Sequence, residues 1–260
     1  MTTGGGVPGL TDEQLQELVT LLGETDTVEL KLTVPDEDRR STIVGLGLDP
    51  LDAFIRQVFF FDTPELALEE AGLVVRARRT QGKPEDSVVK LRPVDPPDLP
   101  PELRARKRFG VEVDALPGGF VCSGSFKGVV KGAGVLAATS GQAPISTLFS
   151  DGQREFFEKH APKGIGLDDL TVLGPVHVFK LKAVPTGGDR RLVTELWFYP
   201  DGSRILELST KCEPGEAFQV ASEVRADLSS RGINLFGEQQ TKTRTALEFF
   251  TRDPAPTSTT

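Results

Sequence analysis

The chain has 260 residues, and 38% of them are hydrophobic, which suffices for a core but is below the usual globular share. Its formal net charge of -8 argues against a general binder of nucleic acid or of an anionic membrane, because both partners are negatively charged. Any basic site is therefore expected to be local and concave, inside an acidic exterior.

The ends and the cysteines suggest a cytoplasmic protein. No apolar run reaches the roughly 18 residues that a membrane span needs, and the first ten residues lack the basic and apolar regions of a signal peptide. Cys122 and Cys212 are the two cysteines, as expected of a chain with reduced thiols. We expect one domain over 11–250 between disordered tails, 1–10 and 251–260, and the sequence leaves the oligomeric state open.

The first third of the chain predicts alternating helices and strands. A capping box opens a helix over 11–22. Residues 27–34 then alternate strictly between apolar and polar side chains, which is typical of a strand with one buried face. Its polar face carries Glu29 and Lys31. We expect three further elements before residue 73: a helix over 36–46, a strand over 55–61 and a short helix over 62–72.

The stretch from 73 to 94 predicts a β-hairpin that turns at residues 81–84. Side chains at i and i+2 share a face of a strand. Arg76 and Arg78 therefore point the same way on the first strand, and Lys90 and Arg92 share a face of the second. Like charges opposed across a ladder destabilise it by up to about 1 kcal/mol per pair. Solvent, acidic neighbours or an anionic ligand must compensate for them.

The rest of the chain continues the pattern after a rigid proline-rich linker at 95–101. Glu112 and Asp114 share the charged face of a strand over 104–114. The Gly-rich stretch at about 116–148 looks like an insertion or a lid, because it lacks an evident core. We expect two further helices, over 150–160 and 213–231, and four more strands, over 176–184, 191–199, 204–211 and 239–250.

Most of these strands pair an aliphatic face with a face that carries ionisable groups. An antiparallel sheet with one wet side would show this pattern. So would a closed barrel whose lumen holds the charges while amphipathic helices cover the outside. The charges are segregated into paired cations on some strands and carboxylates on others. This segregation suits an anion such as phosphate, held by the cations, and a divalent metal held by the carboxylates.

Several motifs together resemble the CYTH-domain family, the triphosphate tunnel metalloenzymes. Glu29-Leu30-Lys31 resembles the end of the ExExK motif that opens these proteins. The segment FFFDTPELALEEAGLVVRARR is similar to the second block of the family, and VVKLR to its next lysine-bearing strand. Glu195 and Glu207 resemble the late acidic residues, and TKTR resembles the C-terminal lysine strand. The resemblance covers roughly 27–247.

The resemblance implies an α+β fold, an eight-stranded antiparallel β-barrel that forms a tunnel with a charged lumen and helices outside. It implies a hydrolase of inorganic, organic or nucleoside triphosphates that uses Mg²⁺ or Mn²⁺. Phosphates would then be clamped by seven cations: Lys31, Arg76, Arg78, Lys90, Arg92, Lys182 and Lys242. The metal would be held by Glu29 and Glu207, with help from Glu112 or Glu195. Further candidates for the cation set are Lys180, Lys211 and Arg244.

Two positions depart from the family pattern. Thr27 stands where the first glutamate of ExExK is expected, and Ser209 replaces the second acid of the late pair. Hard cations prefer charged oxygen ligands, so both changes are expected to weaken metal binding. Two alternatives to a hydrolase therefore stay open. One is a module that binds a triphosphate without hydrolysing it. The other is an adenylyl cyclase, which would need an adenine pocket that the sequence does not identify.

Overall fold

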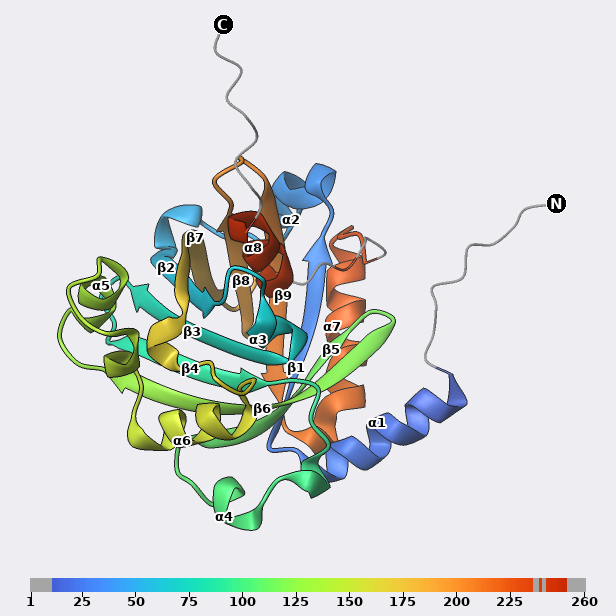
Figure 1. Ribbon diagram of the computed structural model, residues 1–260. Helices are drawn as coiled ribbons and strands as arrows, with labels where there is room; N and C mark the ends of the chain where they lie inside the picture. The colour runs from blue at the N-terminus through green and yellow to red at the C-terminus, as the bar shows by residue number, and fades with distance from the viewer. Residues whose placement is uncertain (1–10, 236–238, 240–241, 252–260) are drawn as a thin grey trace, which may run out of the picture.

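The computed structural model describes residues 11–235, 239 and 242–251. Within them the protein is a closed β-barrel wrapped by helices (Figure 1). The barrel strands are β1 (Thr27–Val34), β2 (Phe54–Asp62), β3 (Leu73–Thr80), β4 (Glu85–Leu91), β5 (Phe109–Leu116), β6 (Gly119–Val130), β7 (Thr171–Ala183), β8 (Leu192–Phe198) and β9 (Arg204–Cys212). The helices are α1 (Asp12–Glu24), α2 (Arg39–Gly45), α3 (Ala67–Glu70), α4 (Pro101–Arg104), α5 (Gly134–Thr139), α6 (Asp151–His160), α7 (Ala217–Ser230) and α8 (Lys242–Thr251).

The strands follow one another around the barrel in the order β1-β5-β6-β4-β3-β2-β7-β8-β9, and β9 pairs with β1 to close it. All neighbouring strands are antiparallel except β1 and β5, which run parallel over the four pairs from Thr27↔Glu112 to Leu30↔Ala115. The predicted α+β barrel is thus confirmed. It has nine strands rather than eight, and one of its pairs is parallel.

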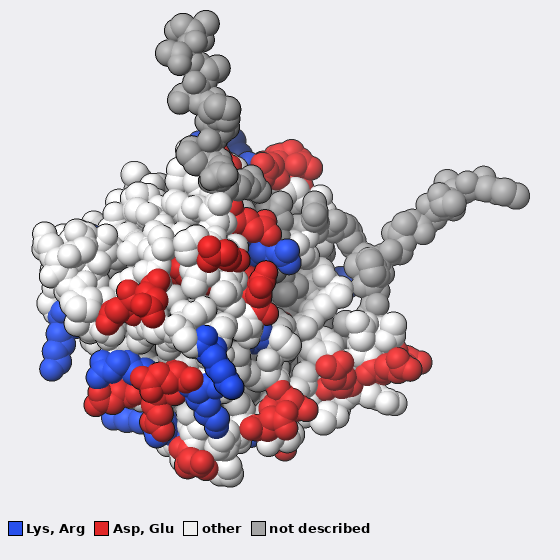
Figure 2. All heavy atoms as spheres, viewed as in Figure 1, with Lys and Arg blue, Asp and Glu red and all other residues white. Residues whose placement is uncertain are grey.

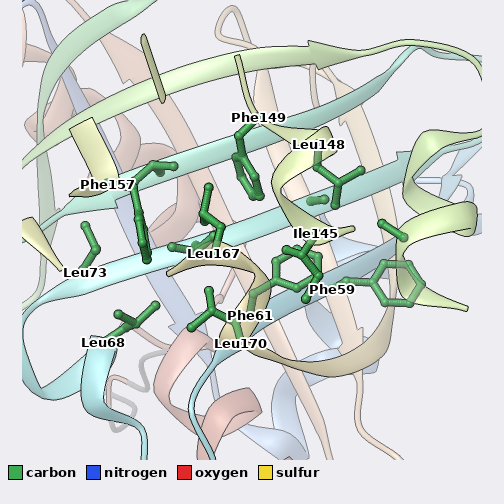
Figure 3. Packing of buried hydrophobic residues seen from close by; sticks show 14 of the residues in the cluster. Phe59, Phe61, Leu68, Leu73, Ile145, Leu148, Phe149, Phe157, Leu167 and Leu170 are labelled. Atoms are coloured by element: carbon green, nitrogen blue, oxygen red, sulfur yellow. The ribbon is translucent and has the colours of Figure 1, made fainter. Parts of the chain in front are cut away.

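The outer face of β2, β3, β4 and β6 is covered by α5 and α6. Phe59, Phe61 and Leu73 of the barrel pack there against Leu148 and Phe157 in one buried cluster (Figure 3). Burying a large apolar side chain stabilises the fold by about 1.5–3 kcal/mol. This cluster therefore fixes the aliphatic faces outward and leaves the polar faces of the same strands to the lumen.

The Gly-rich stretch 116–148 is not an insertion outside the barrel. It supplies β6, which pairs with both β4 and β5, and its later part joins the buried cluster through Val135 and Leu148. Some of its glycines allow close packing. A Cβ at Gly128 would lie 2.2 Å from Oε1 of Gln153, and the Gln153 side chain is fully buried and donates to the carbonyl of Phe126.

The last segment also differs from its prediction, because residues 242–251 form the helix α8 and not a strand. Lys242, Ala246 and Leu247 fall on one side of this helix, as a 3.6-residue period requires. Ala246 and Leu247 pack with lumen-facing side chains of the barrel, among them Val58 and Trp197. Helix α8 therefore closes one end of the barrel (Figure 1).

The tails expected at 1–10 and 252–260 lie outside the described residues, and Thr251 ends α8. Both cysteines are free and buried. No helix among the described residues combines the length and apolar character that crossing a bilayer requires. The face of the molecule in Figure 2 mixes acidic and basic side chains, without the broad basic area typical of a nucleic-acid binder.

Candidate functional site

The polar faces of the strands meet inside the barrel, as the alternation predicts. On β1, Glu29 is paired across the sheet with Asp114 of β5 on one side and with Lys211 of β9 on the other. On β3, Arg76 and Arg78 lie on the face that also carries Lys90 of β4, because Val74 is the partner of Lys90 and Arg78 is the partner of Asp86. The lumen is thus lined by ionisable groups from strands that are far apart in sequence.

Three carboxylates form a cluster at the parallel junction of β1 and β5. Glu29, Glu112 and Asp114 each place an oxygen within 4.8 Å of the others. Lysines approach all three: Lys31 Nζ lies 2.8 Å from Asp114 Oδ1 and 3.4 Å from Glu29 Oε2, and Lys211 is ion-paired with Glu112. Oxygen donors at this spacing suit Mg²⁺ or Mn²⁺, which bind one or two carboxylates together with substrate phosphates.

The electrostatics of the cluster keep Glu29 and Asp114 charged. Burial alone would raise the pKa of Asp114, but the charges of Lys90 and Lys31 overcome this and lower its pKa to about 2. Burial also lowers the pKa of Lys31, and there Asp114 and Glu29 more than compensate, so that the pKa is raised. An ionised carboxylate is the form that a metal ion needs.

Lys90 stands between the carboxylates and the arginines. Its Nζ lies 3.0 Å from Asp114 Oδ2. Burial, helped by the neighbouring Lys31 and Arg76, nevertheless lowers the pKa of Lys90 to about 8. A second anion near Lys90 would relieve that repulsion, so this part of the lumen is short of negative charge.

Arg76 is the least compensated cation of the lumen. Arg78 is bound to Asp86 at 2.6 Å and Arg56 to Glu195 at 3.2 Å. No ion pair or hydrogen bond within the described part of the chain reaches the Arg76 side chain, and its Nε is buried without a partner. Burial, together with the charge of Arg78, lowers the pKa of Arg76. A buried N–H without a hydrogen-bond partner is costly, and a phosphate group would satisfy the half-buried guanidinium in bidentate geometry.

A second acidic pair, Glu195 and Glu207, lies across the β8–β9 ladder. It is already neutralised by cations. Lys242 Nζ lies 2.8 Å from Glu195 and 2.5 Å from Glu207, and Lys180 Nζ lies 2.5 Å from Glu195. These carboxylates therefore anchor α8 and β7, and they are not among the three that the structure gathers into a cluster of metal-binding spacing.

Lys242 is held in the lumen from the first turn of α8. Its Nζ also lies 4.9 Å from the centre of the Trp197 ring, a distance at which a cation and an aromatic face attract. Burial lowers the pKa of Lys242, but Glu195 and Glu207 outweigh it and the pKa is raised. The lysine predicted on a C-terminal strand thus reaches the lumen from a helix.

The two residues that stand in place of the expected acids contact the carboxylate cluster. The Thr27 hydroxyl donates to Glu112 Oε2 at 3.2 Å, and the Ser209 hydroxyl donates to Glu29 Oε1 at 3.2 Å. Each short side chain therefore orients a carboxylate that remains, without adding charge.

Three expected cations are not gathered into this network. Arg92 lies just beyond β4, with a nitrogen 3.9 Å from Glu69 of α3. Lys182 lies on the face of Lys180 but near the end of β7, where it is exposed. Arg244 is exposed on α8 and pairs with Glu248, so it does not share a face with Lys242.

The sequence reasoning did not assign Asp114, Arg56 or Asp86 to the site. The signal for Asp114 was present, because it follows Glu112 by two residues on a strand. Arg56 and Asp86 follow the same rule, two residues before Val58 and Val88 of the lumen face.

Similarity to known proteins is found in the structure and not in the sequence. No protein-family model matches the sequence, and no curated protein is significantly similar to it. The solved structure of HpAC1 from Hippeastrum, described as a proposed adenylyl cyclase with a dominant triphosphatase activity, aligns with a TM-score of 0.62 at 15% identity, over 86% of this chain and 95% of that one. A proposed adenylate cyclase from Bacillus halodurans aligns with a TM-score of 0.58 at 13% identity, over 85% of this chain and 97% of the other.

At identities this low, the structural alignments establish the fold of the chain, and its chemistry must be argued from the residues of the site. The chain has the fold of these cyclase-like and triphosphatase proteins, which is the tunnel fold that the resemblance to CYTH domains implies.

Proposed function

We propose that this protein is a divalent-metal-dependent hydrolase that binds a triphosphate in the lumen of its barrel. The observation that carries the proposal is the presence of two features on the lumen face of one closed barrel. One is the carboxylate cluster Glu29, Glu112 and Asp114, and the other is Arg76, whose Nε is buried with no partner among the described residues. A chain of phosphates that bridges a metal ion to an arginine needs both features.

The chain's own residues would bind and orient the phosphates. Arg76, Arg78 and Lys90 would hold the phosphate oxygens, and Lys31 would neutralise charge beside the carboxylates. The carboxylates that fit a metal are Glu29, Glu112 and Asp114, and a bound Mg²⁺ or Mn²⁺ would neutralise the charge of the transferred phosphoryl group. Fixed cations that face developing charge are the main catalytic device for phosphoryl transfer.

The proposal differs from the sequence-based assignment in two ligands. Glu195 and Glu207 hold Lys242 and Lys180, so we assign them to anchoring rather than to the metal. Asp114 takes their place in the metal set.

The test is phosphate release from tripolyphosphate and from ATP, with Mg²⁺ or Mn²⁺ and with EDTA. We expect metal-dependent release that falls about 100-fold or more in Arg76→Met and in Asp114→Asn, the range seen when one charge-stabilising group is removed. The matched control is Arg79→Met, since Arg79 pairs with Glu85 outside the lumen. Absence of release from any triphosphate at any metal concentration would reject the hydrolase. Cyclic AMP formed from ATP would replace it with a cyclase.

A second candidate is a module that binds triphosphate without turnover. It is favoured by the hydroxyls of Thr27 and Ser209, which contact carboxylates where charged ligands were expected. The double variant Thr27→Glu/Ser209→Glu separates the two readings. A large gain in hydrolysis over an inactive parent would support the binding module, whereas little change would favour a site that is already competent.

A further inference from the structure

A cavity of about 530 Å³ lies outside the barrel, between the outer face of β1 and β9 and the helix α7. Leu30, Leu32, Leu208 and Leu228 line it together with Val224. The volume falls within the range of small-molecule sites, about 300–1,000 Å³.

The cavity exists because the barrel wall splits there. Strands β1 and β5 pair only as far as Leu30 and Ala115, and the β5–β6 hairpin then passes its turn at Pro117 and Gly118 on the rim of the cavity. Helix α7 spans the gap with the small side chain of Ala221 facing it. A larger side chain at Ala221 would fill much of the space.

The charge at the cavity has one sign. No acidic residue lines it, and its two cationic lining residues are Lys31 and Arg225. Lys31 is bound to Asp114 and Glu29 in the lumen. Arg225 is exposed on α7, and no ion pair among the described residues involves it. An aliphatic chamber with one free cation at its edge is complementary to an apolar chain that ends in an anion.

We propose that this cavity binds a single-chain amphiphile with an anionic head, of the fatty-acid class. The chain lies between the outer face of β1 and β9 and the aliphatic face of α7, and the carboxylate head meets Arg225. This site is separate from the lumen and does not depend on triphosphate chemistry, although Lys31 and Ser209 belong to the walls of both.

The proposal predicts a dependence on chain length. Each methylene that enters an apolar site raises the affinity by up to about fourfold. Calorimetric titration with octanoate, decanoate and dodecanoate, all below their micellar concentrations, should give saturable binding that tightens two- to fourfold per methylene. Decanol, which lacks the charge, should bind more weakly than decanoate.

Two variants locate the site. Ala221→Phe fills the cavity and should abolish decanoate binding, and Arg225→Glu should weaken decanoate at least tenfold while it leaves decanol within twofold. Lys163→Glu is the matched charge reversal, at an exposed lysine beyond α6. Thermal unfolding checks that each variant is folded. Arg225 is exposed, so Arg225→Glu keeps the test valid if Ala221→Phe does not fold.

Four results would overturn the proposal. They are no saturable binding, no effect of chain length, equal loss in Arg225→Glu and Lys163→Glu, and displacement of decanoate by excess tripolyphosphate, which would place it among the lumen cations. Sedimentation of the ligand-free protein adds a fifth. A dimer that Arg225→Glu dissociates would show that a second copy covers this face instead.

Discussion

At the scale of single residues, Arg76 lowers the stability of the ligand-free protein and is suited to bind an anion. Its side chain is half-buried, and its Nε is buried without a partner in the described structure, and burial together with Arg78 lowers its pKa. An unpaired buried charge costs free energy in the empty protein. A residue kept under such a cost is typical of a binding site.

Replacement of Arg76 should therefore have opposite effects on stability and binding. We expect Arg76→Met to leave the free energy of unfolding unchanged or to raise it by about 1 kcal/mol, because an apolar side chain of similar length removes the desolvated charge. The same change should weaken tripolyphosphate binding about 10- to 100-fold, the value of one charge-assisted hydrogen-bond pair. Urea unfolding and calorimetric titration measure the two effects. A clear loss of stability with unchanged binding would contradict this role.

Asp114 makes the stability of the protein depend on acid. Its ordinary pKa of 3.8 falls to about 2 in the fold, where Lys90 and Lys31 outweigh burial. A lowered carboxyl pKa stabilises the folded state fully above pH 3.8, and the stabilisation is lost as the pH falls through 2. The contribution is about 2 kcal/mol.

Asp114→Asn should flatten the dependence of stability on pH in that window. Urea unfolding at a series of pH values between 5 and 2 measures it, with Asp151→Asn as a control at an exposed carboxyl on α6. The wild-type slope should exceed that of Asp114→Asn by up to one proton. Identical slopes would show that Asp114 titrates at its ordinary pKa.

At the scale of elements, α8 shows how one side chain can tie a helix to a barrel. Lys242 is the helix's ionic link to the lumen among the described residues, and it lies between Glu195 and Glu207. Removal of one partner of a buried ion pair costs about 3–5 kcal/mol, because the other charge stays desolvated. The rest of the attachment is apolar, through Ala246 and Leu247.

We expect Lys242→Met to destabilise the protein by about 3 kcal/mol and to speed hydrogen exchange in α8 more than in β3 or β4. The double variant Lys242→Met/Glu207→Gln should recover part of the loss, because it removes one uncompensated charge. Arg244→Met is the control, since Arg244 is exposed on the same helix. Equal exchange in α8 of both single variants would show that apolar packing alone holds the helix.

At the scale of the whole molecule, alternation predicted two-faced strands, and the resemblance to CYTH domains favoured a closed barrel over an open sheet. The inward face of each strand could be predicted because side chains two residues apart share a face. Examples are Glu29 and Lys31 on β1 and Arg76 and Arg78 on β3. The glycines of β6 are typical of a loop in the sequence, whereas Gly128 allows the close approach of Gln153 across the fold. Such a contact between distant segments leaves no local pattern.

The strand order and the place of Asp114 in the cluster could not be predicted from the sequence for a related reason. The parallel pairing of β1 with β5 brings Asp114 beside Glu29, and nothing within either strand specifies its neighbour. The segment of α8 was predicted to be a strand because side chains alternate from Thr241 to Thr245. The spacing of Lys242 and Ala246 also fits a helix, and tertiary packing decides between the two.

Ligand binding should stabilise the whole barrel, since the lumen is built from every strand. Tripolyphosphate at 100 times its dissociation constant should raise the free energy of unfolding by about 2.7 kcal/mol. Sulfate at equal ionic strength should raise it by less, because one sulfate cannot span Arg76 and the carboxylate cluster. Thermal unfolding measures both, and Arg76→Met should lose most of the difference. Equal shifts with the two anions would indicate general screening.

The closed end of the barrel has a consequence for the entry of substrate and the release of product. Because α8 packs over one end of the barrel, we expect a ligand to enter and leave at the opposite end, where the Lys211 side chain is 49% exposed. In a hydrolase of the proposed kind, the phosphate product would leave through the same opening by which the next substrate enters. Phosphate and diphosphate should then compete with fresh substrate for passage, and turnover should slow as they accumulate.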